Sequence, residues 1–593
     1  MIFLMALCSV PSFSQDIEAS DAVAAFLGAD SAEEMDPYEV EKLNDLLDRP
    51  VKVNLASSSR LISCGLFTAY QAASLQDYRS NYGDVLSYSE LEALDGFGTD
   101  FVRRVVPFIS LESSSLPGTP SAKEGKFVND IAARTGLKFA GDDGFLWNYG
   151  LKYRMEAGER LSASVSLSRN YDDSRLRPSL FAGHLAWNFR RHSAKLVIGD
   201  FNARFGQGLA FWNGMVLSGL SSPSAFLRRS SGISRSWSFT GTSSLTGAAF
   251  SSYFGRLGVS AAFALPGKTV ANIAWYFPHG QVSLTNHAEF SRLLSDDPRI
   301  PQLKTSADVR FCISGTDIYS EAAYDWVSRT VAVLAGVNFN VAEDFRMASM
   351  LRFYPPEFST DMTGAPRSGS RCCNEYSATL SGEFRSGAYV RIWGKEGFGA
   401  SVRRQHGVFS LDAVYFPESK SDLMPLTWQL KGLMTWEMML TDYLQLSLRL
   451  NERVRNWEDK ALRTDFRIEL EQYSRRFTST LRLNVVNSVS TSFLTYAEGG
   501  LHADRLTFHL RQGLFLIDHW EDRIYVYERD APGSFNVPAY YGRGLWTAFT
   551  VAWKFSRWGR VYARAGMTSY PFMGEEKKKP GKAELKLQYV CSF

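Results

Sequence analysis

Long hydrophobic runs are missing from this sequence beyond its first residues. The sequence contains no stretch of 18 apolar residues, the length that a helix needs to cross a membrane, although hydrophobic residues make up 45% of the chain. An excess of one charge is missing too, because 65 Lys and Arg residues stand against 62 Asp and Glu residues. The resulting net charge of +3 over 593 residues implies no polyanionic partner for the chain as a whole.

Cysteine and histidine are too few and too scattered for a metal site. The six cysteines include Cys8 near the N-terminus, no C-x-x-C pair occurs, and the eight histidines do not fall at ligand spacing. The sequence therefore predicts no metal site and no cofactor. The adjacent Cys372 and Cys373 leave two alternatives, a disulfide in an exported protein or two ordinary thiols. Spacing alone assembles no Ser, His and Asp set, so we predict no catalytic residue and expect no enzyme.

The N-terminus predicts export. Residues Ile2–Leu7 are apolar, and Ser12-Phe13-Ser14 follows with the small residues typical of a cleavage site. We interpret residues 1–14 as a signal peptide that is cut near Ser14, although no Lys or Arg precedes the apolar run.

Apolar and polar residues alternate with period two along much of the chain. Between Leu161 and Ser168 every odd residue is apolar and every even residue is serine, and the alternation recurs at Leu545–Phe555. A membrane barrel produces such a pattern, because outward residues meet lipid while inward residues meet water. From residue 126 onward we therefore predict a mainly β fold, a large antiparallel transmembrane β-barrel of about 18–24 strands, preceded by a small all-α domain.

The last strand carries the most specific signal. One face is apolar, the opposite face is polar with Val590 as its one exception, and the strand ends in an aromatic residue, which resembles the assembly signal of bacterial outer-membrane proteins. The residues of this expected assembly signal are Leu585, Leu587, Tyr589 and Phe593. Outer-membrane lipid and the barrel-assembly machinery are the partners that follow. Lys586 and Gln588 are expected to face the lumen.

Strand direction predicts which parts lie on which side of the membrane. With the C-terminus in the periplasm, short turns such as Arg557-Trp558-Gly559 are periplasmic and the long segment Asp518–Arg543 lies outside. An even number of strands returns the start of the barrel to the periplasm. The expected location is thus the outer membrane, with the N-terminal domain in the periplasm.

Residues 51–111 have a different sequence pattern, which predicts helices separated by two glycine-containing turns. Three segments follow one another in the order found in the tandem helix-hairpin-helix module of ComEA-type DNA receptors, namely Asn54-Leu55-Ala56, Tyr78–Gly83 and Leu91–Gly98. The sequence resembles that module over about 60 residues. The resemblance implies phosphate binding at a helix N-terminus, where free N–H groups and the helix dipole hold an anion.

The residues that would contact DNA follow from the two turns. The DNA-binding hypothesis rests on Gly65, Gly96, Phe97, Gly98, Thr99, Arg103 and Arg104. In the first turn Phe67 replaces the second glycine, and residues 51–111 carry five basic against six acidic residues, a net charge of −1. Because phosphate neutralisation dominates non-specific affinity, any DNA binding should be weak, non-specific and sensitive to salt.

The whole arrangement resembles a family of uncharacterised Bacteroidetes-type outer-membrane proteins. The resemblance continues in four barrel segments, Gly199–Leu209, Phe353–Pro356, Asn374-Glu375 and Tyr525–Gly544. In the first of these, Phe201, Ala203 and Phe205 are expected to face outward. The lumen-lining residues predicted from that orientation are Asp200, Asn202 and Arg204.

The predicted organisation has five parts: a signal peptide at 1–14, a polar helical lead-in at 15–50, the helix-hairpin-helix domain at 51–112, a linker at 113–125 and the barrel at 126–593. Three functions stay open. The barrel could take part in DNA uptake with the domain binding DNA weakly; it could be a solute channel whose domain plugs it or docks on a partner; or it could be an envelope scaffold in which the domain binds a periplasmic or envelope protein.

Overall fold

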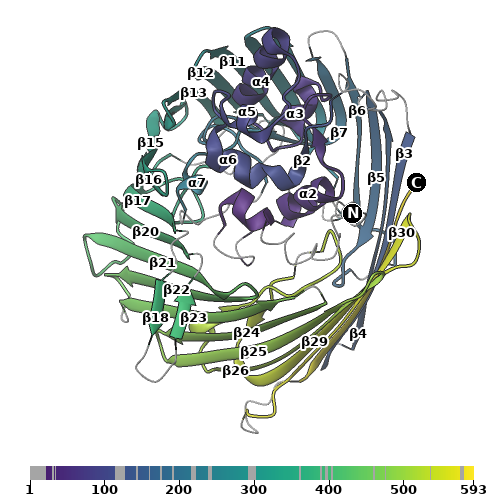
Figure 1. The fold of residues 1–593 in the computed structure, drawn as a ribbon. Helices are drawn as coiled ribbons and strands as arrows, with labels where there is room; N and C mark the ends of the chain where they lie inside the picture. The colour runs from purple at the N-terminus through teal and green to yellow at the C-terminus, as the bar shows by residue number, and fades with distance from the viewer. Residues whose placement is uncertain are drawn as a thin grey trace.

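The computed structural model describes residues 22–29, 33, 35, 37–113 and 127–593, except for short gaps within the last range (Figure 1). These gaps are 142–143, 159, 174–175, 190–192, 215–221, 238, 240–243, 291–301, 359–361, 387–389, 394–398, 403–404, 459–460, 475, 535 and 574–579. The signal peptide expected at 1–14 and nearly all of the linker expected at 113–125 lie outside the described residues.

The N-terminal region folds into short helices: α2 (Pro37–Asp48), α3 (Ser58–Ser63), α4 (Ala69–Tyr82), α5 (Tyr88–Glu92), α6 (Gly98–Val105) and the 3₁₀ turn η2 (Val106–Phe108). Polar side chains start α3, α4 and α5, because a side-chain oxygen can accept the unpaired N–H groups of the first turn. Thr68 and Gln71 form a reciprocal capping box at α4, and Ser57 and Ser87 cap α3 and α5. The short parallel strands β1 (Val51–Lys52) and β2 (Ile109–Ser110) close the unit. Phe67, which stands where the first turn would have a second glycine, packs against other aromatic rings in the core.

A closed antiparallel barrel of 24 strands makes up most of the chain. The wall strands are β3 (Phe127–Ala140), β4 (Phe145–Ala157), β5 (Leu161–Arg169), β6 (Leu180–Asn188), β7 (Lys195–Arg204), β8 (Gly232–Arg235), β9 (Leu245–Phe254), β10 (Leu257–Ala264), β11 (Lys268–Phe277), β12 (Gly280–Glu289), β13 (Gln302–Ile313), β14 (Thr316–Asp325), β15 (Thr330–Ala342), β16 (Phe345–Tyr354), β17 (Glu375–Ser386), β20 (Gln405–Phe416), β21 (Thr427–Thr441), β22 (Leu444–Arg455), β23 (Leu462–Tyr473), β24 (Phe477–Asn487), β25 (Thr491–His502), β26 (Leu506–Ile517), β29 (Gly542–Lys554), β30 (Gly559–Ser569) and β31 (Lys582–Ser592). β8 and β9 both pair with β7 and share one strand position, and β3 pairs with β31 to close the barrel. The predicted fold class is confirmed.

Shorter elements lie between the wall strands: α7 (Pro223–Phe226), the 3₁₀ turn η6 (Trp520–Asp522), and the hairpins β18 (Val390–Trp393) with β19 (Gly399–Val402) and β27 (Ile524–Tyr525) with β28 (Ala539–Tyr540). Among the described residues, the structure contains no helix long and apolar enough to span a membrane.

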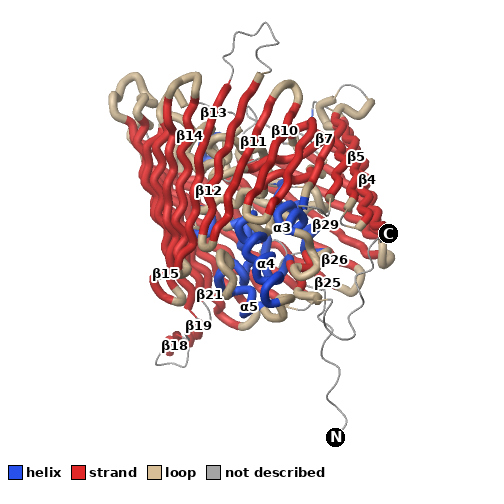
Figure 2. Tube along the Cα trace, turned by 90° about the horizontal axis from the view of Figure 1, so that it is seen from above, coloured by secondary structure: helices blue, strands red, loops and turns tan. Residues whose placement is uncertain are grey.

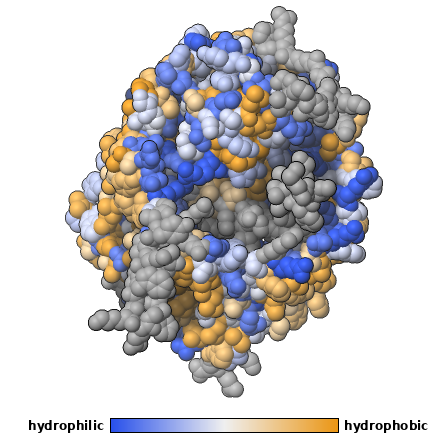
Figure 3. Space-filling view, viewed as in Figure 1, coloured by the Kyte–Doolittle hydropathy of each residue, from blue (hydrophilic) through white to orange (hydrophobic). Residues whose placement is uncertain are grey.

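The two faces of the wall differ as the alternation predicts. In β31, Leu585 and Leu587 are 53% and 49% exposed, whereas their neighbour Gln588 is 3% exposed and points inside. Exposed Leu, Ile, Val, Phe and Trp residues recur on the outer side of nearly every strand. Figure 3 shows hydrophobic residues along much of the outer rim and hydrophilic residues toward the interior. An apolar exterior of this kind is typical of barrels that span a bilayer.

The helical region lies inside the barrel (Figures 1 and 2). We call the end where β3 begins and β31 ends the proximal end, and the opposite end the distal end; Asp130 and Ser592 face each other at the proximal end. We call residues 22–113 the plug, since α2–α6 occupy the lumen. The expectation placed this domain in front of the barrel. The structure differs, because charged side chains of the plug pair with charged side chains of the wall.

Two distal connections fold into the lumen and bind one another. They join β7 to β8 (205–231) and β16 to β17 (355–374). Trp212 N–H donates to Met362 O at 2.9 Å, and Gly364 N–H donates to Gly208 O at 3.0 Å. Together with the inner face of β14–β16 these connections form an apolar cluster, so this side of the lumen is filled.

The distal connection between β26 and β29 also turns inward. Gln588 donates from its side chain to Pro532 O at 2.6 Å, and Lys586 pairs with Asp530 at 2.8 Å. The segment Asp518–Arg543 was expected to lie outside. Its middle part instead folds back on the lumen face, because Glu528 and the carbonyl of Pro532 meet Arg564 and Gln588 of the last two strands, whereas Asp518 and Arg543 pair with each other in an exposed position.

Candidate functional site

The candidate site is the contact between the plug and the lumen wall, where opposite charges meet. α2 has four acidic residues and one basic residue over its length, and three of the acidic residues pair with the wall. The pairs are Glu39 with Arg204, Glu41 with Lys152, and Asp45 with Arg154 at 2.9 Å. Lys152 and Arg204 are almost fully buried, so these pairs are largely removed from water. The α2 helix is therefore held to the wall by ion pairs, while Leu43 and Leu46 pack in the apolar core of the plug.

Glu33 makes the contact on the far side of the lumen. Its carboxylate lies 2.6 Å from Arg482 on β24 and 3.6 Å from Arg467 on β23, and it also accepts the backbone N–H of Tyr527. Burial alone would raise the pKa of Glu33. The two guanidinium groups outweigh burial and hold the pKa well below its usual value of 4.5.

Asp130 joins the plug to the seam of the barrel, by which we mean the pairing of the first wall strand β3 with the last strand β31. This β3 carboxylate receives Arg49 of the plug at 2.6 Å, Arg154 of β4 at 2.7 Å and the Ser592 hydroxyl of β31 at 2.6 Å. One buried side chain thus connects the first strand, the last strand and the plug.

We expect acidification to weaken the docking of the plug. Burial raises the pKa of Glu39 too, but Arg204 and Lys42 lower it further, so both Glu33 and Glu39 have depressed pKa values when docked. A depressed carboxyl pKa contributes stability that is complete above the undocked value, near 4.5, and is lost as the pH falls through the docked value. Protease cleavage within α4, measured from pH 7 to pH 3 with an acid-active protease, should rise below about pH 4.5. A Glu33→Gln, Glu39→Gln variant should show a flatter pH dependence; an equally steep one would contradict this prediction.

The second glycine turn faces a cavity of about 750 Å³ at the proximal end, between the plug and the turns of the wall. Gly96 and Gly98 have φ of +81° and +66°, and a side chain at Gly98 would meet no atom within 4 Å. Thr99 donates to Glu92 at 3.4 Å, Arg103 pairs with Asp100 at 3.5 Å, and Phe97 is buried in the plug core. The structure brings Gly96–Thr99, Arg103 and Arg104 to the same cavity.

Arg104 lies deep in this cavity, and the surrounding charges are mixed. Burial and then the nearby Arg346 guanidinium lower the pKa of Arg104 to about 10. Acidic residues line the cavity as well, and Asp95 reaches His279 of the wall at 3.1 Å. The first turn is closed off, because a Cβ at Gly65 would lie 2.4 Å from the Lys42 ammonium of α2. The sequence alone could not predict that the barrel wall encloses the second turn or that Lys42 covers the first turn.

The predicted lumen row on β7 is placed differently. Register pairs Asp200 with Thr246, which is exposed on the outer face, and Phe201 with Leu245 on the inner face. Phe201, Ala203 and Phe205 are therefore buried in an apolar cluster instead of facing outward, because the odd-numbered residues of β7 share the lumen side with Val197.

Asn202 and Arg204 nevertheless reach the interior, where the chain bends inward after β7. Asn202 accepts a hydrogen bond from the Asn213 amide at 2.7 Å. Arg204 donates to Asn213 O and pairs with Glu39 of the plug.

The last strand lies in the wall as expected. Leu585, Leu587, Tyr589 and Phe593 are exposed on the outer side, at 53%, 49%, 38% and 57%. The main chain of Phe593 exchanges two hydrogen bonds with Asn129 at the start of β3, so the final residue takes part in closing the barrel.

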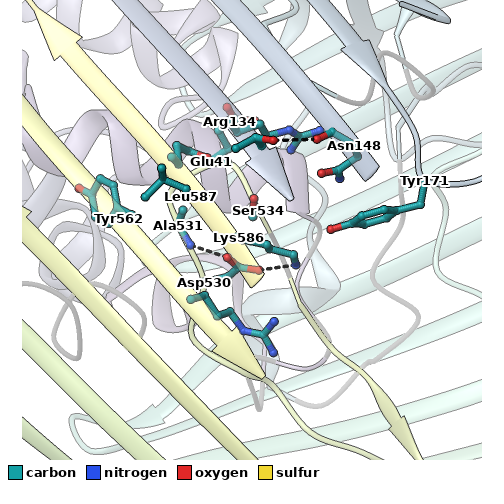
Figure 4. Close-up of a pocket in the computed structure, with 14 residues that line it drawn as sticks. Glu41, Arg134, Asn148, Tyr171, Asp530, Ala531, Ser534, Tyr562, Lys586 and Leu587 are labelled. Carbon is teal, nitrogen blue, oxygen red and sulfur yellow. Dashed lines mark hydrogen bonds and ion pairs between the residues drawn. The ribbon is translucent and has the colours of Figure 1, made fainter. Parts of the chain in front are cut away.

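A smaller cavity of about 240 Å³ lies between the plug, the inward segment 530–534 and the seam (Figure 4). Glu41, Arg134 and Lys586 border it, and Lys586 is engaged by Asp530. Among the described residues no three His, Cys, Asp or Glu side chains are grouped to hold a metal ion. Cys372 and Cys373 are both free thiols.

No protein-family model and no curated protein sequence matches the chain. Several solved structures align with most of the chain at low identity. The siderophore receptor PirA from Pseudomonas aeruginosa is 8% identical with a TM-score of 0.38, over 79% of this chain and 81% of that one. The P pilus usher PapC translocation pore is 9% identical with a TM-score of 0.31, over 79% and 99%. OccK11 (OpdR) from Pseudomonas aeruginosa is 9% identical with a TM-score of 0.29, over 79% and 98%. Similarity this low carries no function over, so any function must come from the residues of this chain.

Proposed function

We propose that the protein is an outer-membrane channel whose N-terminal helices form a releasable plug. The observation that carries this proposal is the set of ion pairs between α2 and the wall. A polar contact of this kind can exchange its partners for water, whereas an apolar core contact cannot do so at low cost. The proximal end would face the periplasm, and lipid would surround the apolar exterior after insertion by the barrel-assembly machinery.

The burial of the wall supports a channel. Inward-facing side chains of β12 and β13, such as Ser283, His287 and Lys304, are buried beneath the plug and the inward connections. On β21–β23 the inward-facing charged side chains are only half-buried, so water reaches this part of the lumen.

DNA binding by the second glycine turn is less well supported. A cavity of 750 Å³ is in the range of small-molecule sites. A DNA duplex is far larger, since its major groove alone is about 12 Å wide. DNA could reach Arg104 only after the plug had left the lumen. A periplasmic partner that docks on the exposed side of the plug would be compatible with either function.

The test is the conductance of the purified full-length protein in planar bilayers. A Glu39→Gln, Glu41→Gln, Asp45→Asn variant should show more frequent or larger openings than the wild type, because three plug contacts are weakened at once. A matched control with the same change in charge is Asp77→Asn, Asp422→Asn, Asp504→Asn, since all three are exposed. Closed channels in the plug variant, or equal opening in the control, would contradict a releasable plug.

A further inference from the structure

The lumen face of β21–β23 carries cations that lie directly opposite one another. Lys431 of β21 faces Arg453 of β22, and Arg453 faces Arg463 of β23, so three cations form one rung across three neighbouring strands. Four residues along β22, Arg449 faces Arg467 in a second rung. All five side chains are half-buried, and the period-two alternation places them on the same side of the wall.

Like charges opposite one another on neighbouring strands destabilise a sheet. Few carboxylates compensate here: on the same face of β23, Asp465 lies between the two rungs, opposite Asn451. Glu458 approaches Arg453 at 3.7 Å and is closer to Arg455, at 2.6 Å, while Arg467 shares Glu33 with Arg482. The Nε groups of Arg453 and Arg467 are buried and have no hydrogen-bond partner among the described residues. A sequence that keeps such a local conflict is expected to use it in function.

The charge on this wall changes sign along the axis. The two basic rungs occupy its distal and middle parts, and the proximal part carries Glu437, Glu469 and Glu471 on the same face. An anion that enters from the distal end would therefore meet the two basic rungs, with the single carboxylate of Asp465 between them, before it meets the three glutamates. This order favours binding of the anion at the basic rungs, because the glutamates at the proximal end repel it and slow its exit.

We propose that small anionic solutes, bearing carboxylate or phosphate groups, bind at the Lys431–Arg453–Arg463 and Arg449–Arg467 rungs and pass along β21–β23. This inference rests on the proposed channel function and names its substrate class. The guanidinium groups supply paired donors that match the oxygens of carboxylate and phosphate. The bound anion also screens the repulsion within each rung, so binding and stability are coupled.

The first experiment measures reversal potentials in a KCl gradient, in the plug variant that opens the channel. The channel should prefer Cl⁻ over K⁺. Adding Lys431→Gln, Arg453→Gln and Arg463→Gln should lower the anion-to-cation permeability ratio several-fold. Matched changes at the acidic end, Glu437→Gln, Glu469→Gln and Glu471→Gln, should raise it. A cation-selective channel, or an unchanged ratio in the basic-rung variant, would overturn the inference while leaving the channel intact.

The second experiment does not need an open channel. Inorganic phosphate or citrate, added to the wild-type protein in detergent at constant ionic strength, should raise its unfolding temperature. The basic-rung variant should lose this shift, and without added anion it should be at least as stable as the wild type because the repulsion is gone. If no variant conducts but the anion-dependent shift is present and lost in this way, the channel fails and the anion site stands. If the shift is absent, the anion site fails.

Discussion

Replacing Asp130 by leucine should destabilise the folded barrel by roughly 3 kcal/mol, the lower end of the range for breaking a buried ion pair. Among the described residues, the change leaves Arg154 with the partly exposed Asp45 as its one remaining ion-pair partner, and it removes the acceptor of both Arg49 and Ser592. Because these partners belong to the plug and to both seam strands, the loss should appear as earlier unfolding on heating and as easier proteolysis of the plug. Heat-modifiability on gels, followed against temperature, measures the first effect.

The control for this change is Asp172→Leu, which replaces an exposed aspartate in the connection after β5. Exposed substitutions of this kind usually change stability by less than about 0.5 kcal/mol. Equal unfolding temperatures for the Asp130 and Asp172 variants would show that Asp130 does not join the plug to the seam.

Replacing Leu587 by arginine should cost about 2–4 kcal/mol and reduce the amount of folded barrel in the membrane. Leu587 lies at the middle of β31 with its side chain on the outer face, where the arginine would meet hydrocarbon. The amount of folded, heat-modifiable protein in isolated outer membranes is the measurement.

Two variants separate charge from size. Leu587→Phe keeps an apolar surface at the same position and should assemble normally. Lys586→Arg keeps a cation on the lumen side, where Asp530 and Glu584 can still pair with it. Normal levels of the Leu587→Arg protein would mean that the outer face of β31 does not meet lipid.

The wall was predictable because in each strand apolar residues that face lipid alternate with polar residues that face the lumen. The strict alternation from Leu161 to Ser168 predicted β5, and the alternation at the end of the chain predicted β31 together with its inward and outward faces. The same rule misled at β7. There Phe201 packs in an apolar cluster on the lumen side and Asp200 lies on the other face, so the contrast between the two residues indicated the wrong orientation.

The contents of the lumen were not predictable, because they depend on which distant charges meet. Nothing local to Glu33 indicates that Arg482, far along the chain, will pair with it. The acidic lead-in before residue 51 and the basic rungs of β21–β23 were visible as charges, but matching them requires the closed barrel. The glycine turn at Gly96–Gly98 was recognisable from its pattern, whereas its enclosure by the wall was not.

The seam also constrains the order of folding. Asp130 and Ser592 are separated by 462 residues, and the plug that reaches the same carboxylate is made before either strand. Contacts so distant in sequence slow folding, because a long loop must close before they form. The seam can close only when the last strand has been made. The plug must therefore either lie within the curved, still open sheet before closure or enter through the proximal end afterwards. A barrel assembled from a chain without residues 22–113 would therefore report, through its closure rate, which of these two orders the full chain follows.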